Sequence, residues 1–188
     1  MIELKAFLSQ VVTALQKTEI PYLITGSVGS TIYGDPRATR DIDFIIDPTE
    51  AQLKHFVQEL ASEYYISLEA ALDAFHRRFM FNVIDSSTGW KADFIIRKNN
   101  RYEQMKFQRR VQEVYLNIPI NVATPEDIIL SKLLWAKESD SERQVRDAFG
   151  VVAVQGERLD KEYLSKWAKE LGVEEVLEKI FKEASRLR

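Results

Sequence analysis

The chain has 188 residues, of which 26 are Lys or Arg and 29 are Asp or Glu, so its formal net charge is −3. Hydrophobic residues make up 45% and charged residues 29% of the sequence. This globular balance excludes a disordered chain, a collagen-like repeat and a strongly basic protein that coats nucleic acid. The absence of cysteine excludes disulfide frameworks, thiolate nucleophiles, zinc ribbons and iron–sulfur clusters.

Only two histidines, His55 and His76, occur in the chain, which is too few for a multi-histidine metal site. A divalent cation would therefore have to be bound by carboxylates, which favour Mg²⁺ or Mn²⁺. The first residues, MIELKAFLSQ, contain an acid and a base and do not resemble a signal peptide. No apolar run approaches the roughly 20 residues of a membrane span. We expect a cytoplasmic protein with no membrane partner.

Helices and strands are predicted to alternate up to residue 123. Apolar residues at helical spacing predict helices, short apolar runs predict strands, and Asp85-Ser86-Ser87-Thr88-Gly89 predicts a hairpin turn. Asp47-Pro48-Thr49-Glu50 predicts a helix start with proline at the first helical position. The expected helices cover residues 2–15, 28–33, 48–60, 67–76 and 101–109, and the expected strands cover 22–24, 41–46, 79–84, 90–96, 111–116 and 118–122.

A second helix start at Thr124-Pro125-Glu126-Asp127 opens a pattern that stays helical to the end of the chain. Breaks in this pattern are expected near Ser139, Gly156 and Gly172. The chain therefore divides into a mixed α/β part, residues 1–123, and a helical part, residues 124–188.

Asp41 and Asp43 are the sharpest chemical feature of the sequence. Residues two apart on a strand point to the same face, so both carboxylates would project together while Ile42 and Phe44 turn into the core. Adjacent carboxylates repel each other, and a hard divalent cation with oxygen ligands relieves that repulsion. Two solvated aspartates at the end of a strand are the alternative.

Asp93 stands inside an apolar strand, where a buried acid needs a partner or a metal. It is predicted as the third carboxylate of a two-metal site; an edge-strand acid that faces water is the alternative. Gly26-Ser27 lies between a strand and a short helix, where exposed N–H groups favour phosphate. A plain serine N-cap after a glycine turn is the alternative for this segment.

Taken in this order, Gly26-Ser27, Asp41-x-Asp43 and Asp93 resemble the signature of the polymerase-β-like nucleotidyltransferase superfamily. The segment GDPRATRDID, residues 34–43, and the helical segments from Pro125 onward are similar to small prokaryotic nucleotidyltransferases of the AbiEii and MenT toxin type. The resemblance implies an α/β (α+β) fold with a mixed β-sheet flanked by helices. Residues 1–123 would be the nucleotidyltransferase core and residues 124–188 a C-terminal helical region.

The resemblance also implies Mg²⁺-dependent (or Mn²⁺-dependent) transfer of a nucleoside monophosphate from an NTP to a hydroxyl acceptor. Asp41, Asp43 and Asp93 would be the catalytic metal ligands, and Asp93 would lie beside the acceptor hydroxyl as its base. Gly26 and Ser27 would hold the β- and γ-phosphates.

Lys132 and Arg40 complete the predicted site. Lys132 lies in an otherwise apolar helix, where it either extends toward solvent or, as in the toxin-like families, faces the nucleotide phosphates. Arg37 and Arg40 flank the acid pair on a loop and would steer phosphates or acceptor, with a solvated loop as the alternative. The i,i+4 spacing of Arg143 and Asp147 predicts a simple helix ion pair.

In the toxin-like interpretation the acceptor is RNA, such as a tRNA end, and an antitoxin protein is a partner. Residues 97–110 carry six basic residues against one acid, with two aromatic residues between them. This composition suits RNA, although a solvated helix face is the simpler interpretation. Two other functions stay open: a non-catalytic nucleotide-binding regulatory module, and an enzyme that modifies a small molecule such as an antibiotic.

Overall fold

The computed structural model describes residues 2–36 and 38–186, which form two compact units. Unit 1 comprises Met1–Ile24 and Thr39–Val122, and unit 2 comprises Thr25–Ala38 and Ala123–Arg188. Residues 25–38 thus pack with the helical unit, whereas the predicted boundary at residue 123 assigns them to the α/β part. None of the described helices is long and apolar enough to cross a membrane.

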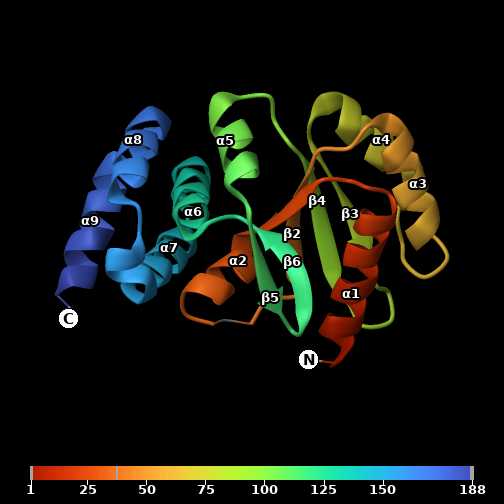
Figure 1. The fold of residues 1–188 in the computed structure, drawn as a ribbon, viewed down its shortest axis with the longest axis horizontal. Helices are drawn as coiled ribbons and strands as arrows, with labels where there is room; N and C mark the ends of the chain where they lie inside the picture. Colours follow the sequence, from red (N-terminus) through yellow and green to blue (C-terminus); the bar gives the residue numbers. More distant parts are fainter. Residues whose placement is uncertain (1, 37, 187–188) are drawn as a thin grey trace. The chain divides into compact units, whose positions relative to one another are not determined.

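Unit 1 contains the mixed sheet that the resemblance implies (Figure 1). In the described part of the chain the strand order is β3-β4-β2-β1-β6-β5. The pairs β2–β4 and β1–β6 are parallel, whereas β3–β4 and β5–β6 are antiparallel hairpins. The strands are β1 (Tyr22–Thr25), β2 (Asp41–Ile46), β3 (Met80–Ile84), β4 (Lys91–Ile96), β5 (Val111–Tyr115) and β6 (Ile118–Val122).

Four helices described for unit 1 accompany this sheet: α1 (Ile2–Lys17), α3 (Glu50–Leu60), α4 (Leu68–Arg77) and α5 (Arg101–Arg109). The core centres on Phe94 of β4. Its ring lies 5.0 Å from that of Phe44, 5.2 Å from that of Phe81 and 5.0 Å from that of Phe56, between centroids. Phe44, Phe94 and Phe81 are register partners on three adjacent strands. Because side chains alternate between the two faces, this row of rings defines which face of β2, β3 and β4 carries polar groups.

The predicted start of α3 is wrong by two residues. The helix begins at Glu50 with Thr49 as its N-cap, and Thr49 and Gln52 form a reciprocal capping box. Pro48 therefore precedes the helix. Asp47 does not cap it, and its carboxylate instead pairs with Arg97 at 2.9 Å.

Unit 2 contains the helices that were expected after residue 124, together with α2. It consists of α2 (Gly26–Tyr33), α6 (Pro125–Ser139), α7 (Glu142–Gln155), the short 3₁₀ turn η1 (Gly156–Arg158), α8 (Lys161–Leu171) and α9 (Glu174–Ser185). The chain passes very close to α7 just after α2. A Cβ on Gly34 would lie 2.8 Å from the backbone nitrogen of Val151, so only glycine fits there. The Gln155 side chain also donates a 2.6 Å hydrogen bond to the Tyr33 carbonyl.

Candidate active site

Asp43 and Asp93 lie directly opposite each other on the parallel strands β2 and β4, and Asn82 is the partner of Asp93 on β3. The alternation of side chains puts this row on the face opposite the phenylalanine row. Asp41, two residues before Asp43, shares the same face. Its side chain is 54% exposed, whereas that of Asp93 is only 12% exposed. The structure therefore brings the three predicted carboxylates together on one face of the sheet.

Both oxygens of Asp93 have partners within unit 1. The side-chain amide of Asn82 donates to Oδ1, and the Lys91 ammonium lies 3.1 Å from Oδ2. The same ammonium lies 3.5 Å from Oδ1 of Asp41. Burial lowers the pKa of Lys91, but the hydrogen bonds and charges of Asp93 and Asp41 outweigh that effect and raise the pKa above its ordinary 10.5. Lys91 is therefore a cation at neutral pH.

The donor chemistry of this face suits a hard divalent cation, because all three acids offer carboxylate oxygens. In this conformation, no group of three or more Asp, Glu or His side chains among the described residues is arranged to hold a metal ion. The positive charge beside Asp41 and Asp93 comes from Lys91 instead. The residue types thus fit a metal ion. In this conformation the Lys91 ammonium contacts two of the three carboxylates.

In unit 2, the predicted phosphate-binding pair opens helix α2. Gly26 has a φ of 60°, a conformation that glycine adopts readily, and Ser27 is 8% exposed. The N-cap residue, Thr25, makes no side-chain capping bond, and its buried hydroxyl has no hydrogen-bond partner among the described residues. Helix N-termini attract anions, and the phosphate role of Gly26 and Ser27 stays a prediction.

Lys132 of α6 lies in a buried ion pair with Asp147 of α7. Its Nζ is 2.7 Å from Oδ2 of Asp147, and the two side chains are 5% and 7% exposed. The i,i+4 spacing predicts Arg143 as the partner of Asp147, but in the structure the carboxylate of Asp147 pairs with Lys132. The ion pair with Asp147 explains how a buried lysine is accommodated in an apolar helix, because it compensates the buried charge. Its contact with nucleotide phosphates stays a prediction.

Arg40 is exposed and directly precedes β2, and its carbonyl accepts a 3.1 Å hydrogen bond from the Lys91 amide. Its guanidinium lies beside Gly89 of the hairpin turn. Arg40 thus lies in unit 1 with the carboxylates, and its phosphate role stays a prediction. Arg37 lies outside the described residues.

Several side chains of the basic segment, residues 97–110, make ion pairs or cation–π contacts with other residues of unit 1. Arg97 pairs with Asp47 at 2.9 Å, and the buried Lys106 pairs with Glu103 at 2.8 Å. The Arg110 guanidinium stacks 4.7 Å from the centre of the Phe107 ring. These contacts favour a structural role for several of the six basic residues.

The sequence did not point to Thr25, Asn82 or Lys91, nor to the pairing of Asp147 with Lys132. Lys91 could have been found, because it precedes Asp93 by two residues and must share its face. Asn82 needs the register of the β3–β4 hairpin, and Asp147 needs the packing of α6 on α7. A local sequence pattern predicts neither strand register nor helix packing.

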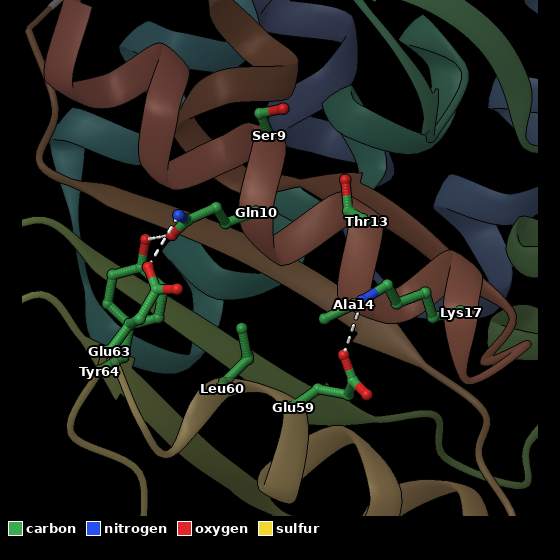
Figure 2. Close-up of a pocket in the computed structure, with 9 residues that line it drawn as sticks. All are labelled: Ser9, Gln10, Thr13, Ala14, Lys17, Glu59, Leu60, Glu63 and Tyr64. Atoms are coloured by element: carbon green, nitrogen blue, oxygen red, sulfur yellow. Dashed lines mark hydrogen bonds and ion pairs between the residues drawn. The ribbon is translucent and has the colours of Figure 1, made fainter.

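A shallow pocket of about 170 Å³ lies in unit 1, along α1 and the C-terminal end of α3. Figure 2 shows hydrogen bonds from Gln10 to Glu63 and from Tyr64 to Gln10, and an ion pair between Lys17 and Glu59. No predicted site residue lines it, and its polar groups are engaged with one another.

Several solved structures share the fold. The antibiotic-resistance factor ANT(2'')-Ia is 12% identical with a TM-score of 0.58, over 89% of this chain and 92% of that one. A nucleotidyltransferase-like antigenic protein from Paracoccidioides brasiliensis is 16% identical with a TM-score of 0.55, over 93% and 91%. The lincosamide antibiotic adenylyltransferase LnuA is 14% identical with a TM-score of 0.55, over 78% and 95%. At these identities the likeness concerns the fold.

No curated protein sequence matches the chain. A protein family does match over residues 30–175, and its description is the nucleotidyl transferase AbiEii toxin of the type IV toxin–antitoxin system. The match covers most of the chain, including both aspartates of β2, Asp93 and Lys132. The chain therefore belongs to the AbiEii family of nucleotidyltransferases.

Proposed function

We propose that this nucleotidyltransferase transfers a nucleoside monophosphate from an NTP to a hydroxyl acceptor, using Mg²⁺ or Mn²⁺ held by Asp41, Asp43 and Asp93. The observation that carries the proposal is the register pairing of Asp43 with Asp93, with Asp41 on the same face. When bound, the divalent cations neutralise the charge that develops on the phosphoryl oxygens.

In the proposed reaction the acceptor oxygen forms a bond to the α-phosphorus as the bond to the β-phosphate bridging oxygen breaks, so pyrophosphate leaves. The acceptor proton passes to a carboxylate oxygen of Asp93. Asn82 orients that carboxylate through its amide. Gly26 and Ser27 bind the β- and γ-phosphates at the start of α2, and Lys132 and Arg40 supply further positive charge to the nucleotide. Catalysis then consists mainly of positioning and charge neutralisation.

For the acceptor, we propose RNA, with a tRNA end as the first candidate and an antitoxin protein as a partner. The toxin–antitoxin description of the family supports this choice. NTPs and tRNA are cytoplasmic molecules, so the proposed reaction would take place in the cytoplasm.

A small-molecule acceptor is the second candidate. ANT(2'')-Ia has been solved in complex with adenylyl-2''-tobramycin, and LnuA is an adenylyltransferase of lincosamide antibiotics. The internal ion pairs of the basic segment also reduce the charge that is available to RNA. A non-catalytic nucleotide-binding module is less well supported, because all three acids are present.

The test incubates the protein with each α-³²P-labelled NTP, Mg²⁺, and total RNA, purified tRNA, aminoglycosides or lincosamides in parallel. We expect label on RNA, and loss of labelling in the Asp41→Asn/Asp43→Asn double variant. Asp73→Asn is the matched control, because it removes an exposed carboxylate that pairs with Arg77 on the same helix, α4. Label on an antibiotic with RNA inert would establish the second candidate. No transfer with any NTP and acceptor, or full transfer by the double variant, would contradict the proposal.

A further inference from the structure

Lys91 holds a position that the proposed reaction does not use. Its ammonium bridges two of the three carboxylates, at 3.1 Å from Asp93 and 3.5 Å from Asp41. We propose that Lys91 is a resident counter-ion of the carboxylate cluster, which competes with the divalent cation and so weakens metal binding when no nucleotide is bound. This inference rests on the proposed metal role of the three aspartates.

The backbone register explains why the ammonium is there. Lys91 is the partner of Asp41 across the β2–β4 pair and stands two residues before Asp93 on β4, so all three side chains share one face. Asp93 and the facing Asp43 are carboxylates on adjacent strands, and Lys91 places a positive charge beside Asp93 and Asp41. Like charges so close resist ionisation. An intrinsic cation therefore stabilises the cluster in the absence of metal.

The same contact has a cost for metal binding. A divalent cation held by Asp93 and Asp41 would compete with the ammonium for these carboxylates, and the positive charge of Lys91 would repel it. The Lys91 side chain is 34% exposed and flexible, so it can withdraw toward solvent. Metal binding must then break both ion pairs, so the free energy of metal binding becomes less favourable by the free energy of those pairs.

The alternative role for Lys91 is a phosphate ligand that assists the reaction without opposing the metal. The two roles predict opposite results in a measurement of metal binding without nucleotide. A competitor weakens Mn²⁺ binding, whereas a ligand of the phosphates leaves it unchanged.

The experiment measures the Mn²⁺ dissociation constant of the intact chain by electron paramagnetic resonance, with no nucleotide, for the wild type and for Lys91→Met, Lys91→Gln, Lys91→Arg and Lys54→Met. Lys54→Met is the matched control. It removes the same charge, from an ion pair with Glu50 on α3 whose side chains are similarly exposed. Thermal unfolding in EDTA is recorded for each variant. The Gln variant retains a polar side chain if the Met variant does not fold.

We expect Lys91→Met and Lys91→Gln to bind Mn²⁺ about threefold or more tightly than the wild type, the scale of partly exposed ion pairs. Lys91→Arg and Lys54→Met should keep the wild-type affinity. In EDTA, the Met variant should melt at a lower temperature, and Mn²⁺ should raise its melting temperature by more than it raises that of the wild type.

Two further results separate this inference from the proposed function. Asp93→Asn should abolish the Mn²⁺ binding of the wild type. Binding that Asp93→Asn does not weaken would overturn the metal role of the aspartates and the inference with it. Binding that Asp93→Asn does abolish, but that neither neutral Lys91 variant tightens, would overturn the inference alone.

Discussion

Asp43 on β2 and Asp93 on β4 face each other across a parallel strand pair, one residue away in each strand from the stacked rings of Phe44 and Phe94. The carboxylates are thus held in place by the same packing that forms the core. A change to the phenylalanine row would shift the backbone that carries the acids, although the rings point to the opposite face.

Replacing Asp93 by Asn should reduce nucleotide transfer by about 100-fold or more, because the variant loses both a negatively charged oxygen and the proposed proton acceptor. The fold should persist, since the amide is isosteric and Asn82 and Lys91 remain. Single-turnover transfer of α-³²P label measures the effect, with Asp73→Asn as control. Transfer at the wild-type rate would exclude Asp93 from the chemistry.

Asn82 should act by orienting Asp93. We expect Asn82→Ala to lower kcat by roughly tenfold with little change in the KM for the NTP, as for other groups that orient catalytic ligands. Asn99→Ala, in an exposed bend, should leave both constants unchanged. The split between kcat and KM is the informative readout. A rise in KM alone would instead indicate a role in nucleotide binding.

The buried Lys132–Asp147 pair allows the structural and functional roles of Lys132 to be separated. Lys132→Met should destabilise the protein by about 3–5 kcal/mol, because it breaks a buried ion pair by removing one partner. The double variant Lys132→Met/Asp147→Leu should regain most of that stability, since an apolar pair of similar size replaces the charges. Urea unfolding measures both.

Transfer activity then decides the role of the lysine. If Lys132 binds phosphates, the double variant should be stable but should have a higher KM for the NTP. A stable double variant with wild-type kinetics would show that the pair is purely structural.

Gly34→Ala should destabilise unit 2 by about 1–3 kcal/mol, because the added Cβ would meet the Val151 nitrogen at 2.8 Å and the Gly150 carbonyl carbon at 2.9 Å. Gly150→Ala on α7 is a matched control. Its Cβ would find its nearest neighbours at 3.5 Å, an ordinary contact, and alanine favours a helix. Thermal unfolding should therefore separate the two variants; equal melting temperatures would contradict the close approach.

Asp85 should make a pH-dependent contribution to stability. Hydrogen bonds from the side chains of Ser87 and Thr88 hold the pKa of Asp85 below its ordinary 3.8. Because the folded pKa is lowered, the contribution is fully present above pH 3.8 and is lost as the pH falls through the folded value.

Urea unfolding of the wild type and Asp85→Asn as a function of pH tests this sign. The difference in stability between them should be largest near neutral pH and should shrink as the pH falls below 3.8. Thr88→Val, which removes one hydroxyl donor to Asp85, should reproduce part of the effect. A difference that grows toward acid would contradict the assignment.

Local patterns were enough to predict most of the elements. Short-range signals predicted β2 and the β3–β4 hairpin, and the structure contains both. These signals are the alternation in DIDFII and ADFII and the turn in DSSTG. The start of α3 was misjudged because proline before Thr49 imitates a first helical residue, whereas the reciprocal bonds of Thr49 and Gln52 determine the cap.

Long-range partners were out of reach. Which strand lies beside β4, and in which register, depends on the whole sheet, so the row of Asn82, Asp93 and Asp43 emerges only in the folded chain. Likewise, spacing alone favours Arg143 as the partner of Asp147, but the packing of α6 on α7 provides the Lys132 ammonium from the preceding helix.

The narrow passage of Gly34 against α7 bears on how this family can evolve. Unit 2 is assembled from two separate stretches of sequence, and the first of them, residues 25–38, comes after β1 and before β2 along the chain. The helical unit is therefore not one continuous segment that could be exchanged as a block. A gene fusion or truncation that exchanged only the segment after residue 123 would leave Gly34 and the Gly26-Ser27 turn without their native helix neighbours, so we expect such recombinants to be counter-selected.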